Sequence, residues 1–365
     1  MINKKKIVLF GNSSWYFFNF KINLLNDLSK KYYIILIIPE DKYLKKFKKQ
    51  FKIIKLNYEI SNKINFLEPF TLLYKVYRVC KKIKPHLIIN YTIKCNFYGI
   101  IIGKLLNIKI ISNITGLGYS FLNDQFIFRI IKKIYFFLLK FSDLIILQNI
   151  HDYSYFKNII NKKKLRVIES SGIKITDIKT KNNYINKNKK FLMISRLIKE
   201  KGINEYLEAA KIVKKINPEV QFYLYGQANN DFLYEKVLSF HKKKIIFYGN
   251  FSNNISDIIK KCDCVVLPSY REGSSKTLLE ASLYQKAIIA SDVPGCNNIA
   301  INGINAILCS PKSIIDLVEA IKKFMTLDKA TIINMGKEGR KHIIKNFDVN
   351  VINKKTLLEI KYILT

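Results

Sequence analysis

Glu272 and Glu280 are the side chains whose type and spacing most directly suggest chemistry. They lie in the segment 268–281, PSYREGSSKTLLEA, which directly follows the apolar run 264–267. We expect a strand, a tight polar turn that holds Glu272, and a helix with Glu280 two turns inside it. Gly273 lets a ligand approach the backbone, the free N–H groups of a helix start attract an anionic or hydroxyl-rich group, and a carboxylate accepts paired hydroxyls. The alternative is an ordinary helix start, with Glu280 paired with a lysine.

Other polar turns follow apolar runs in the same half of the chain. They are SRLIKEKG at 195–202, YG at 225–226, FYGN at 247–250 and SDVPG at 291–295. Together with the EX7E spacing of the two glutamates, this ordered series resembles the family 4 retaining glycosyltransferases. These enzymes have the GT-B fold, in which two Rossmann-like, doubly wound α/β domains face each other across a cleft. The resemblance covers nearly the whole chain.

The resemblance implies roles for the residues in these turns. Members of the family transfer a sugar from a nucleotide sugar without a metal or other cofactor, so we expect a UDP-sugar as the donor substrate. The catalytic candidates are Arg196 and Lys201, which hold the diphosphate as negative charge develops on it, and Glu272, which holds the transferred sugar. Glu280 is expected to bind the ribose hydroxyls. The full set of donor-binding candidates is Gly226, Asn250, Gly273, Ser274, Ser275, Lys276 and Glu280.

Arg196 also stands out by its residue type. Only six of the 63 basic residues are Arg, and a guanidinium binds a phosphate through two parallel hydrogen bonds, which Lys cannot do. Without the surrounding motif, a surface salt bridge would be the preferred interpretation of Arg196.

The first half of the chain carries the candidates for acceptor binding. The turn GNSSW at 11–15 follows the first apolar run and resembles the family's N-terminal loop, and the segments 91–96 and 113–119 end later runs. The acceptor-binding candidates are Gly11, Asn12, Ser13, Lys94, Thr115 and Gly116. Many family members carry a His near the place of Thr115 or Gly116. Its absence here makes a His-assisted step doubtful and favours a front-face reaction assisted by the substrate itself.

Short β-rich runs alternate with amphipathic stretches along the whole chain, which predicts two mainly parallel sheets with helical crossovers. The expected strands are 7–10, 34–38, 51–56, 87–91, 108–112 and 144–148 in the first half, and 191–194, 222–225, 245–248, 264–267, 287–290 and 306–309 in the second. A polar stretch at 176–190 suggests a linker. We therefore expect an acceptor-binding domain at 1–180, a nucleotide-sugar-binding domain at 181–345, and a C-terminal helix at 346–365 that packs on either domain.

The composition bounds the alternatives. The net charge is +36, which suits work near polyanions such as nucleic acid, acidic lipid or phosphorylated substrates. The abundance of Lys, Ile and Asn points to A/T-rich codons, however, so part of this charge is diffuse. A GT-B sugar-nucleotide epimerase and a basic nucleic-acid-binding protein are the rivals. The first lacks visible acid/base residues, the second lacks a recognition helix or stacking motif, and we expect no nucleic-acid partner.

The segment 126–141 suggests a membrane partner. It is bulky and apolar, and its cations at 129, 132, 133 and 140 share one helical face, as in a helix that lies on an anionic bilayer. A helix packed against the sheet is an equal alternative. The six Cys show no paired or metal-ligating spacing, and no signal peptide or membrane span is recognised. We expect a cytoplasmic enzyme, peripheral on the inner face of the bacterial inner membrane, that extends a polyprenyl-diphosphate-linked saccharide such as an O-antigen or N-glycan precursor.

Overall fold

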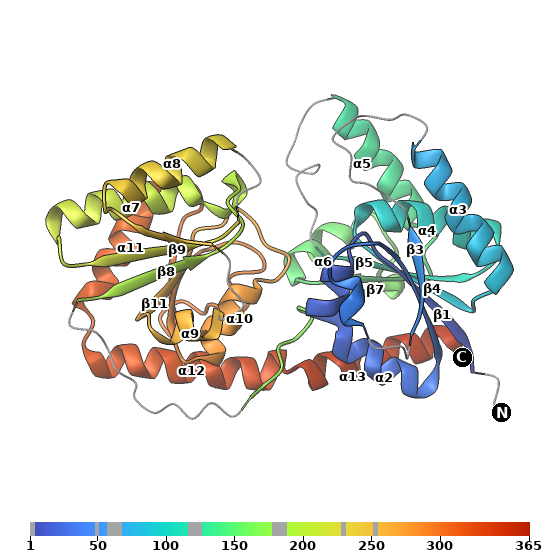
Figure 1. The fold of residues 1–365 in the computed structure, drawn as a ribbon. Coiled ribbons are helices and arrows are strands. Elements are labelled where there is room, and N and C mark those ends of the chain that lie inside the picture. Colours follow the sequence, from blue (N-terminus) through green and yellow to red (C-terminus); the bar gives the residue numbers. More distant parts are fainter. Residues whose placement is uncertain are drawn as a thin grey trace. The chain divides into compact units, whose positions relative to one another are not determined.

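The computed structural model describes residues 4–47, 51–56, 68–115, 126–176, 188–227, 231–250 and 255–365. The chain divides into two compact units (Figure 1). Unit 1 comprises Met1–Gly172 and Val349–Thr365, and unit 2 comprises Ile173–Asp348. The domain boundaries at 180 and 345 stay predictions, because most of the expected linker, 177–187, lies outside the described residues.

Unit 1 is built on a parallel sheet with the strand order β3-β2-β1-β4-β5-β6-β7. Its strands are β1 (Lys6–Phe10), β2 (Tyr33–Pro39), β3 (Lys52–Leu56), β4 (Leu87–Tyr91), β5 (Lys109–Ile114), β6 (Leu144–Leu147) and β7 (Leu165–Val167). The central strands are buried on both faces, as the wholly buried run 34–39 in β2 illustrates. Each such Ile or Leu contributes about 1.5–3 kcal/mol when it leaves water, so helices must cover both faces.

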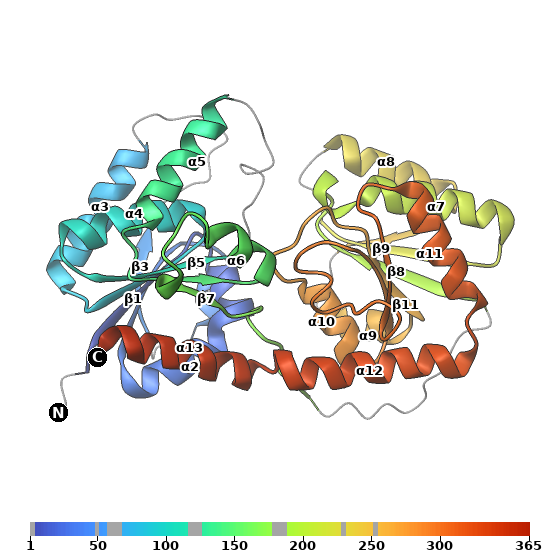
Figure 2. The ribbon, with the colours of Figure 1, turned by 180° about the vertical axis from the view of Figure 1, so that it is seen from behind.

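The helices of unit 1 form two layers around this sheet. They are α1 (Ser14–Tyr16), α2 (Ile22–Lys31), α3 (Glu68–Ile83), α4 (Ile93–Leu105), α5 (Phe126–Leu139), α6 (Ile150–Phe156) and α13 (Val349–Leu364). A π-helical turn, Phe17–Lys21, joins α1 to α2. Helices α2 and α13 lie on one face of the sheet, and α3, α4 and α5 lie on the other (Figures 1 and 2). The C-terminal helix belongs to this unit because Ile352, Ile360 and Leu364 are buried in the same core cluster as β1 and α2.

Unit 2 repeats the arrangement with the strand order β10-β9-β8-β11-β12-β13, again with parallel pairing. Its strands are β8 (Lys190–Ile194), β9 (Gln221–Tyr225), β10 (Phe247–Gly249), β11 (Cys264–Leu267), β12 (Ala287–Ser291) and β13 (Ala306–Cys309). Its helices are α7 (Ile203–Ile216), α8 (Asp231–Lys242), α9 (Ile255–Lys260), α10 (Lys276–Leu283), α11 (Ile314–Thr326) and α12 (Lys329–Phe347). Helices α7, α8 and α11 lie on one face of the sheet, and α9, α10 and α12 lie on the other (Figure 2).

The prediction of two doubly wound, parallel α/β domains is confirmed. Every expected strand is present within two residues of its expected ends, and β7 was missed because it is a three-residue edge strand with no alternating pattern. In both sheets the strand order reverses direction next to the first strand, between β1 and β4 in unit 1 and between β8 and β11 in unit 2. Such switch points at the carboxyl ends of parallel strands are where doubly wound folds bind ligands.

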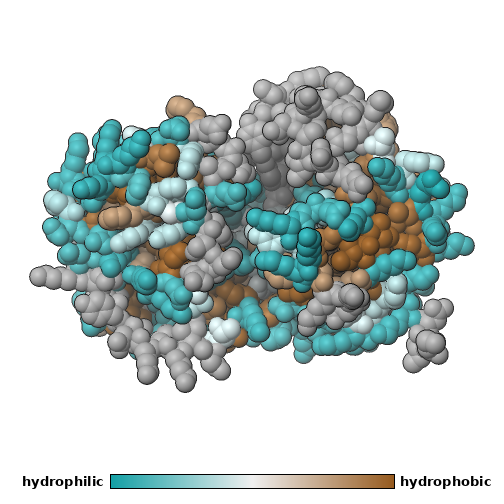
Figure 3. Space-filling model, viewed as in Figure 1, coloured by the Kyte–Doolittle hydropathy of each residue, from teal (hydrophilic) through white to brown (hydrophobic). Residues whose placement is uncertain are grey.

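Three further features bear on the predictions made from composition. Among the described residues, no helix is long and apolar enough to cross a membrane. On the face drawn in Figure 3, hydrophilic side chains are spread over both units rather than gathered in one place. The six cysteines are free and buried.

Candidate functional site

The loop between β11 and α10 carries Glu272 and is held by its backbone. The Glu272 amide donates to the Pro294 carbonyl (3.2 Å), and the Ser275 amide donates to the Gly295 carbonyl (3.0 Å). Gly295 has φ +79°, and a Cβ on it would lie 2.4 Å from the Glu272 carbonyl oxygen, so only glycine fits there. The amides of Gly273 and Ser274 have no acceptor in the described part of the chain. They are therefore available to a ligand.

Lys201 and Glu272 form an ion pair across the switch point of unit 2. The Lys201 ammonium contacts Glu272 Oε1, and the two side chains are 19% and 10% exposed. Ser269 Oγ donates to the same Oε1 at 2.8 Å. The family resemblance implied separate roles for these two side chains, Lys201 on the diphosphate and Glu272 on the sugar. The structure brings them into direct contact.

Gly202 allows this contact because it ends the turn that carries Lys201. It has φ +73°, and a Cβ on it would lie 2.0 Å from the Pro268 carbonyl oxygen. The β8–α7 loop and the β11–α10 loop therefore touch backbone to backbone. Arg196, by contrast, is exposed, and no ion pair is found for it among the described residues.

Glu280 lies one turn after the start of α10, not two, because the helix begins at Lys276 with Ser275 as its N-cap. Its carboxylate is 3.7 Å from the Lys276 ammonium, so the pairing with a lysine is present. Burial raises the pKa of Glu280, and Lys276 partly offsets this rise. The side chain is 20% exposed.

A third loop brings Gly226 and Asn250 together. The Tyr248 hydroxyl lies 3.0 Å from the Gly226 carbonyl oxygen and 2.9 Å from Asn250 Oδ1, and the Gly226 amide donates to the Gly249 carbonyl. Gly226 and Asn250 were predicted from the sequence, but Tyr248, which joins them, was not. The FYGN turn contained that signal.

The acceptor candidates of unit 1 lie at the carboxyl ends of β1, β4 and β5, which are neighbours in the sheet. Gly11 is buried against the Phe17 ring, Asn12 is exposed, and Ser13 caps α1 by accepting from the Tyr16 amide. The amides of residues 14 and 15 are bound by Asp41 Oδ2 at 3.0 and 3.3 Å. The chain's own carboxylate thus occupies the start of α1. No pattern in the sequence predicts this contact, because Asp41 lies on a different loop.

The neighbouring β4–α4 turn has a strained backbone. Thr92 has φ +78° and ψ 159°, a region that is essentially reserved for glycine and that recurs at functional sites. Lys94 follows it in the first turn of α4 and is exposed, and partial burial lowers its pKa. Thr115 follows β5 and is half-buried. Gly116 lies outside the described residues.

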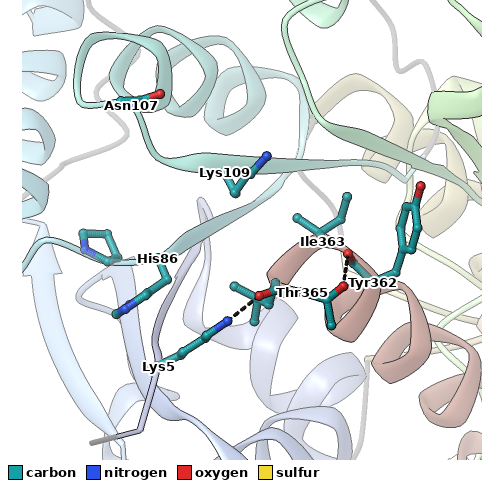
Figure 4. A pocket seen from close by; sticks show the side chains of 9 residues that line it. Lys5, His86, Asn107, Lys109, Tyr362, Ile363 and Thr365 are labelled. Atoms are coloured by element: carbon teal, nitrogen blue, oxygen red, sulfur yellow. Dashed lines mark hydrogen bonds between the residues drawn. The ribbon is translucent and has the colours of Figure 1, made fainter.

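Other potential sites are few. Within the described ranges, no group of three or more His, Cys, Asp or Glu side chains could hold a metal ion. A cavity of about 600 Å³ opens at the amino ends of β1, β4 and β5, between Lys5, His86, Lys109 and Tyr362 (Figure 4). None of the predicted site residues lines it.

Comparison with known proteins identifies the family. Residues 174–342 match the model of glycosyl transferases group 1, and residues 6–149 match the glycosyl transferase 4-like model. Together the two models cover most of the chain, so the chain is a glycosyltransferase. The two family domains correspond to unit 2 and unit 1, and neither the epimerase nor the nucleic-acid-binding alternative is supported.

Two curated relatives of this glycosyltransferase are similar over most of their length. One is the N,N'-diacetylbacillosaminyl-diphospho-undecaprenol alpha-1,3-N-acetylgalactosaminyltransferase of Campylobacter jejuni, with 26% identity over 93% of this chain and 94% of the relative. The other is the UDP-Gal:alpha-D-GlcNAc-diphosphoundecaprenol alpha-1,3-galactosyltransferase of Escherichia coli, with 25% identity over 78% of each chain.

Solved structures confirm the GT-B fold. The Anabaena protein HepE in complex with UDP and glucose has a TM-score of 0.79 and 18% identity, covering 98% of this chain and 99% of that one. A glycosyltransferase from Rickettsia africae has a TM-score of 0.80 and 19% identity, covering 100% and 99%.

Proposed function

We propose that this glycosyltransferase transfers a hexose or an N-acetylhexosamine, such as N-acetylgalactosamine, from a UDP-sugar to a saccharide carried on a polyprenyl diphosphate. In this proposal the product is an intermediate in surface polysaccharide or glycan biosynthesis. The observation that carries the proposal is the junction of the Lys201 and Glu272 loops at the switch point of unit 2, together with the names of the two curated relatives. Both names specify α products, which from α-linked UDP-sugars requires retention of configuration.

The donor diphosphate is proposed to bind at this junction. The transition state gains negative charge on the diphosphate oxygens, and cations or amides fixed in advance stabilise that charge. Lys201 is held at the site by Glu272, Arg196 extends from the same loop into solvent, and the Gly273 and Ser274 amides are unoccupied. In this proposal Glu272 also keeps a carboxylate oxygen for the hydroxyls of the transferred sugar.

Glu280 is proposed to accept hydrogen bonds from the ribose hydroxyls of UDP. We expect Glu280→Ala to weaken UDP binding about tenfold or more, because a paired charged hydrogen bond contributes about 1.5–3 kcal/mol. Glu319→Ala is the matched control, since Glu319 also pairs with a lysine on its own helix, at 2.9 Å, but lies on α11. Calorimetric titration of both variants with UDP measures the difference, and equal affinities would exclude this role.

Acceptor binding is proposed for unit 1, at the turns after β1, β4 and β5. The Lys94 ammonium and the Gly11–Ser13 turn provide a cation and polar groups for a diphosphate-linked saccharide. Thr115 or Gly116 stands near the place where many members of the family carry a His, so in this proposal the leaving diphosphate oxygen takes the proton of the attacking hydroxyl. Cleavage of the sugar–diphosphate bond and formation of the new glycosidic bond then occur on the same face of the sugar.

The activity is tested with a panel of nucleotide sugars and a synthetic polyprenyl-diphosphate saccharide. The expected result is UDP release that depends on the acceptor, with a product one α-linked sugar longer. Release with another nucleotide, or only in the absence of the lipid-linked acceptor, would contradict the proposal. The β-anomer as product would contradict retention.

A membrane partner is proposed for helix α5. The helix packs on the sheet through Tyr135 and Leu139, which are fully buried, so the interpretation as a covering helix is correct for that face. On another face Ile130, Ile134 and Phe137 are 38%, 44% and 58% exposed at helical spacing. The exposed cations at 129, 133 and 140 lie along one side of this stripe, an arrangement that suits an anionic bilayer. The proposed location is the inner face of the bacterial inner membrane.

Vesicle binding tests this surface. Vesicles containing phosphatidylglycerol are expected to bind the protein, and binding is expected to weaken as the Debye length falls from about 10 Å at 0.1 M to about 3 Å at 1 M salt. Ile134→Ser with Phe137→Ser is expected to reduce binding and turnover on a long-chain acceptor but not on a short soluble one. The control replaces Leu358 and Tyr362 of α13, which are 58% and 65% exposed. Equal losses on both acceptors would mean that the changes damage the fold.

A further inference from the structure

Glu205 is a buried carboxylate outside all the motifs described above. It lies in the first turn of α7 and is 8% exposed. Its Oε1 accepts a hydrogen bond of 2.7 Å from the Tyr270 hydroxyl, and its Oε2 has no partner in the described part of the chain. Burying a carboxylate costs several kcal/mol unless its hydrogen bonds compensate. The bond to Tyr270 is therefore the hydrogen bond that compensates for the burial of the Glu205 carboxylate.

Tyr270 is held from three directions. Its hydroxyl donates to Glu205, its backbone amide donates to the Glu200 carbonyl at 2.8 Å, and the Lys312 ammonium lies 5.3 Å from the centre of its ring. Burial and the bond to Glu205 raise the pKa of Tyr270, so the hydroxyl remains a donor throughout the physiological range. The side chain is therefore fixed in one orientation.

This contact joins the two loops of the candidate site. Tyr270 stands two residues before Glu272, and Glu205 stands four residues after Lys201. The Glu205–Tyr270 bond, the Lys201–Glu272 ion pair and the bond from the Tyr270 amide to the Glu200 carbonyl therefore connect the same two segments at three points. The backbone bond holds the main chain at residue 270, the ion pair holds the Glu272 side chain, and the Glu205–Tyr270 bond holds the Tyr270 side chain.

We propose that Glu205 is a positioning residue for sugar transfer, acting through Tyr270 to set where Glu272 and the start of α10 stand relative to Lys201. The inference rests on the proposed donor site. Glu205 touches no substrate in this scheme. Its effect comes from geometry, because displacing a binding group by about 1 Å can lower turnover about 100-fold.

The experiment compares Tyr270→Phe, Glu205→Ala, their double variant and Glu205→Gln. Tyr270→Phe and Glu205→Ala are each expected to lower kcat about 10- to 100-fold, with a smaller change in the UDP dissociation constant. The double variant is expected to lose no more than either single variant, because both remove the same bond. Glu205→Gln keeps an oxygen that accepts from Tyr270 and is expected to keep most of the turnover.

Tyr223→Phe is the matched control. The Tyr223 hydroxyl donates to Gln221 Oε1 at 2.8 Å, within unit 2 but on β9. Tyr223→Phe removes a comparable hydrogen bond and is expected to leave kcat unchanged. The inference would be overturned if Tyr270→Phe left kcat unchanged, as Tyr223→Phe is expected to do. It would also be overturned if the losses in kcat multiplied in the double variant.

Hydrogen–deuterium exchange gives a readout that needs no substrate. Tyr270→Phe and Glu205→Ala are expected to speed amide exchange in residues 268–275, while Tyr223→Phe leaves that loop unchanged. Unchanged exchange in 268–275 would overturn the positioning role even if the enzyme is active. Faster exchange with no transfer from any UDP-sugar by the wild type would instead refute the proposed function alone.

Discussion

Lys21 offers a test of how a buried charge affects the stability of unit 1. It ends the π-helical turn, is 7% exposed, and lies with its ammonium 5.4 Å from the centre of the Tyr91 ring. Among the described residues no carboxylate pairs with it. Burial lowers the pKa of Lys21 to about 8 from an ordinary 10.5.

The pKa shift sets the size of the expected effect. Each pKa unit corresponds to about 1.4 kcal/mol, so protonated Lys21 costs unit 1 about 3 kcal/mol at pH 7. The contact with the Tyr91 ring returns about 2 kcal/mol at most, part of which a Met sulfur would also provide. We therefore expect Lys21→Met to raise the free energy of unfolding by about 1–3 kcal/mol at pH 7.

The pH dependence has a definite sign. Between about pH 8 and 10.5 the unfolded chain binds a proton at Lys21 that the folded chain lacks, so wild-type stability rises with pH across this window. Below about pH 8 Lys21 is protonated in the folded chain as well, so the full cost of burying its charge is present. The difference in stability between Lys21→Met and the wild type is expected to shrink as the pH rises through this range.

Trp15 makes the measurement specific to unit 1. It is the only tryptophan of the chain and contacts Phe20 edge-on, on the turn that carries Lys21. Urea unfolding followed by its fluorescence is run at pH 7, 8 and 9.5, with Lys31→Met on the exposed end of α2 as the control. Destabilisation by Lys21→Met at pH 7 would refute the reasoning, since it would mean that the ammonium has a compensating partner.

Three further outcomes are expected. Gly202→Ala should lower stability and turnover together, because its Cβ would strike the Pro268 carbonyl. Gly303 is the control: it has φ +76° and open space around it, so Gly303→Ala should cost only about 1 kcal/mol of backbone strain and leave turnover unchanged. Arg196→Lys should lower kcat more than it changes donor affinity if its guanidinium holds the leaving diphosphate; steady-state kinetics with unchanged kcat would exclude this. Burial raises the pKa of Glu280, so UDP affinity should fall on acidification at a higher pH than for an ordinary glutamate, and Glu280→Gln should remove that dependence in calorimetric titrations.

The sequence by itself determined the order and spacing of the strands and the polar turns at their carboxyl ends. Buried parallel strands are read from short apolar runs, and a parallel sheet places all its strand ends on one edge, so turns far apart in the chain were expected to meet. This is why, in unit 2, Gly202 meets the 268–275 loop and Gly226 meets the turn at 195–202.

Only the tertiary structure decided which side chains pair across those turns. The contacts of Glu272 with Lys201, of Tyr270 with Glu205 and of Asp41 with the start of α1 join segments that no local pattern connects. The same holds for the burial of Lys21, whose position on a π-helical turn breaks the regular helical spacing. Hydrophobic periodicity predicts which face of each segment is buried in the core. Side-chain pairing depends instead on the distances between segments, and these distances are determined only by tertiary packing.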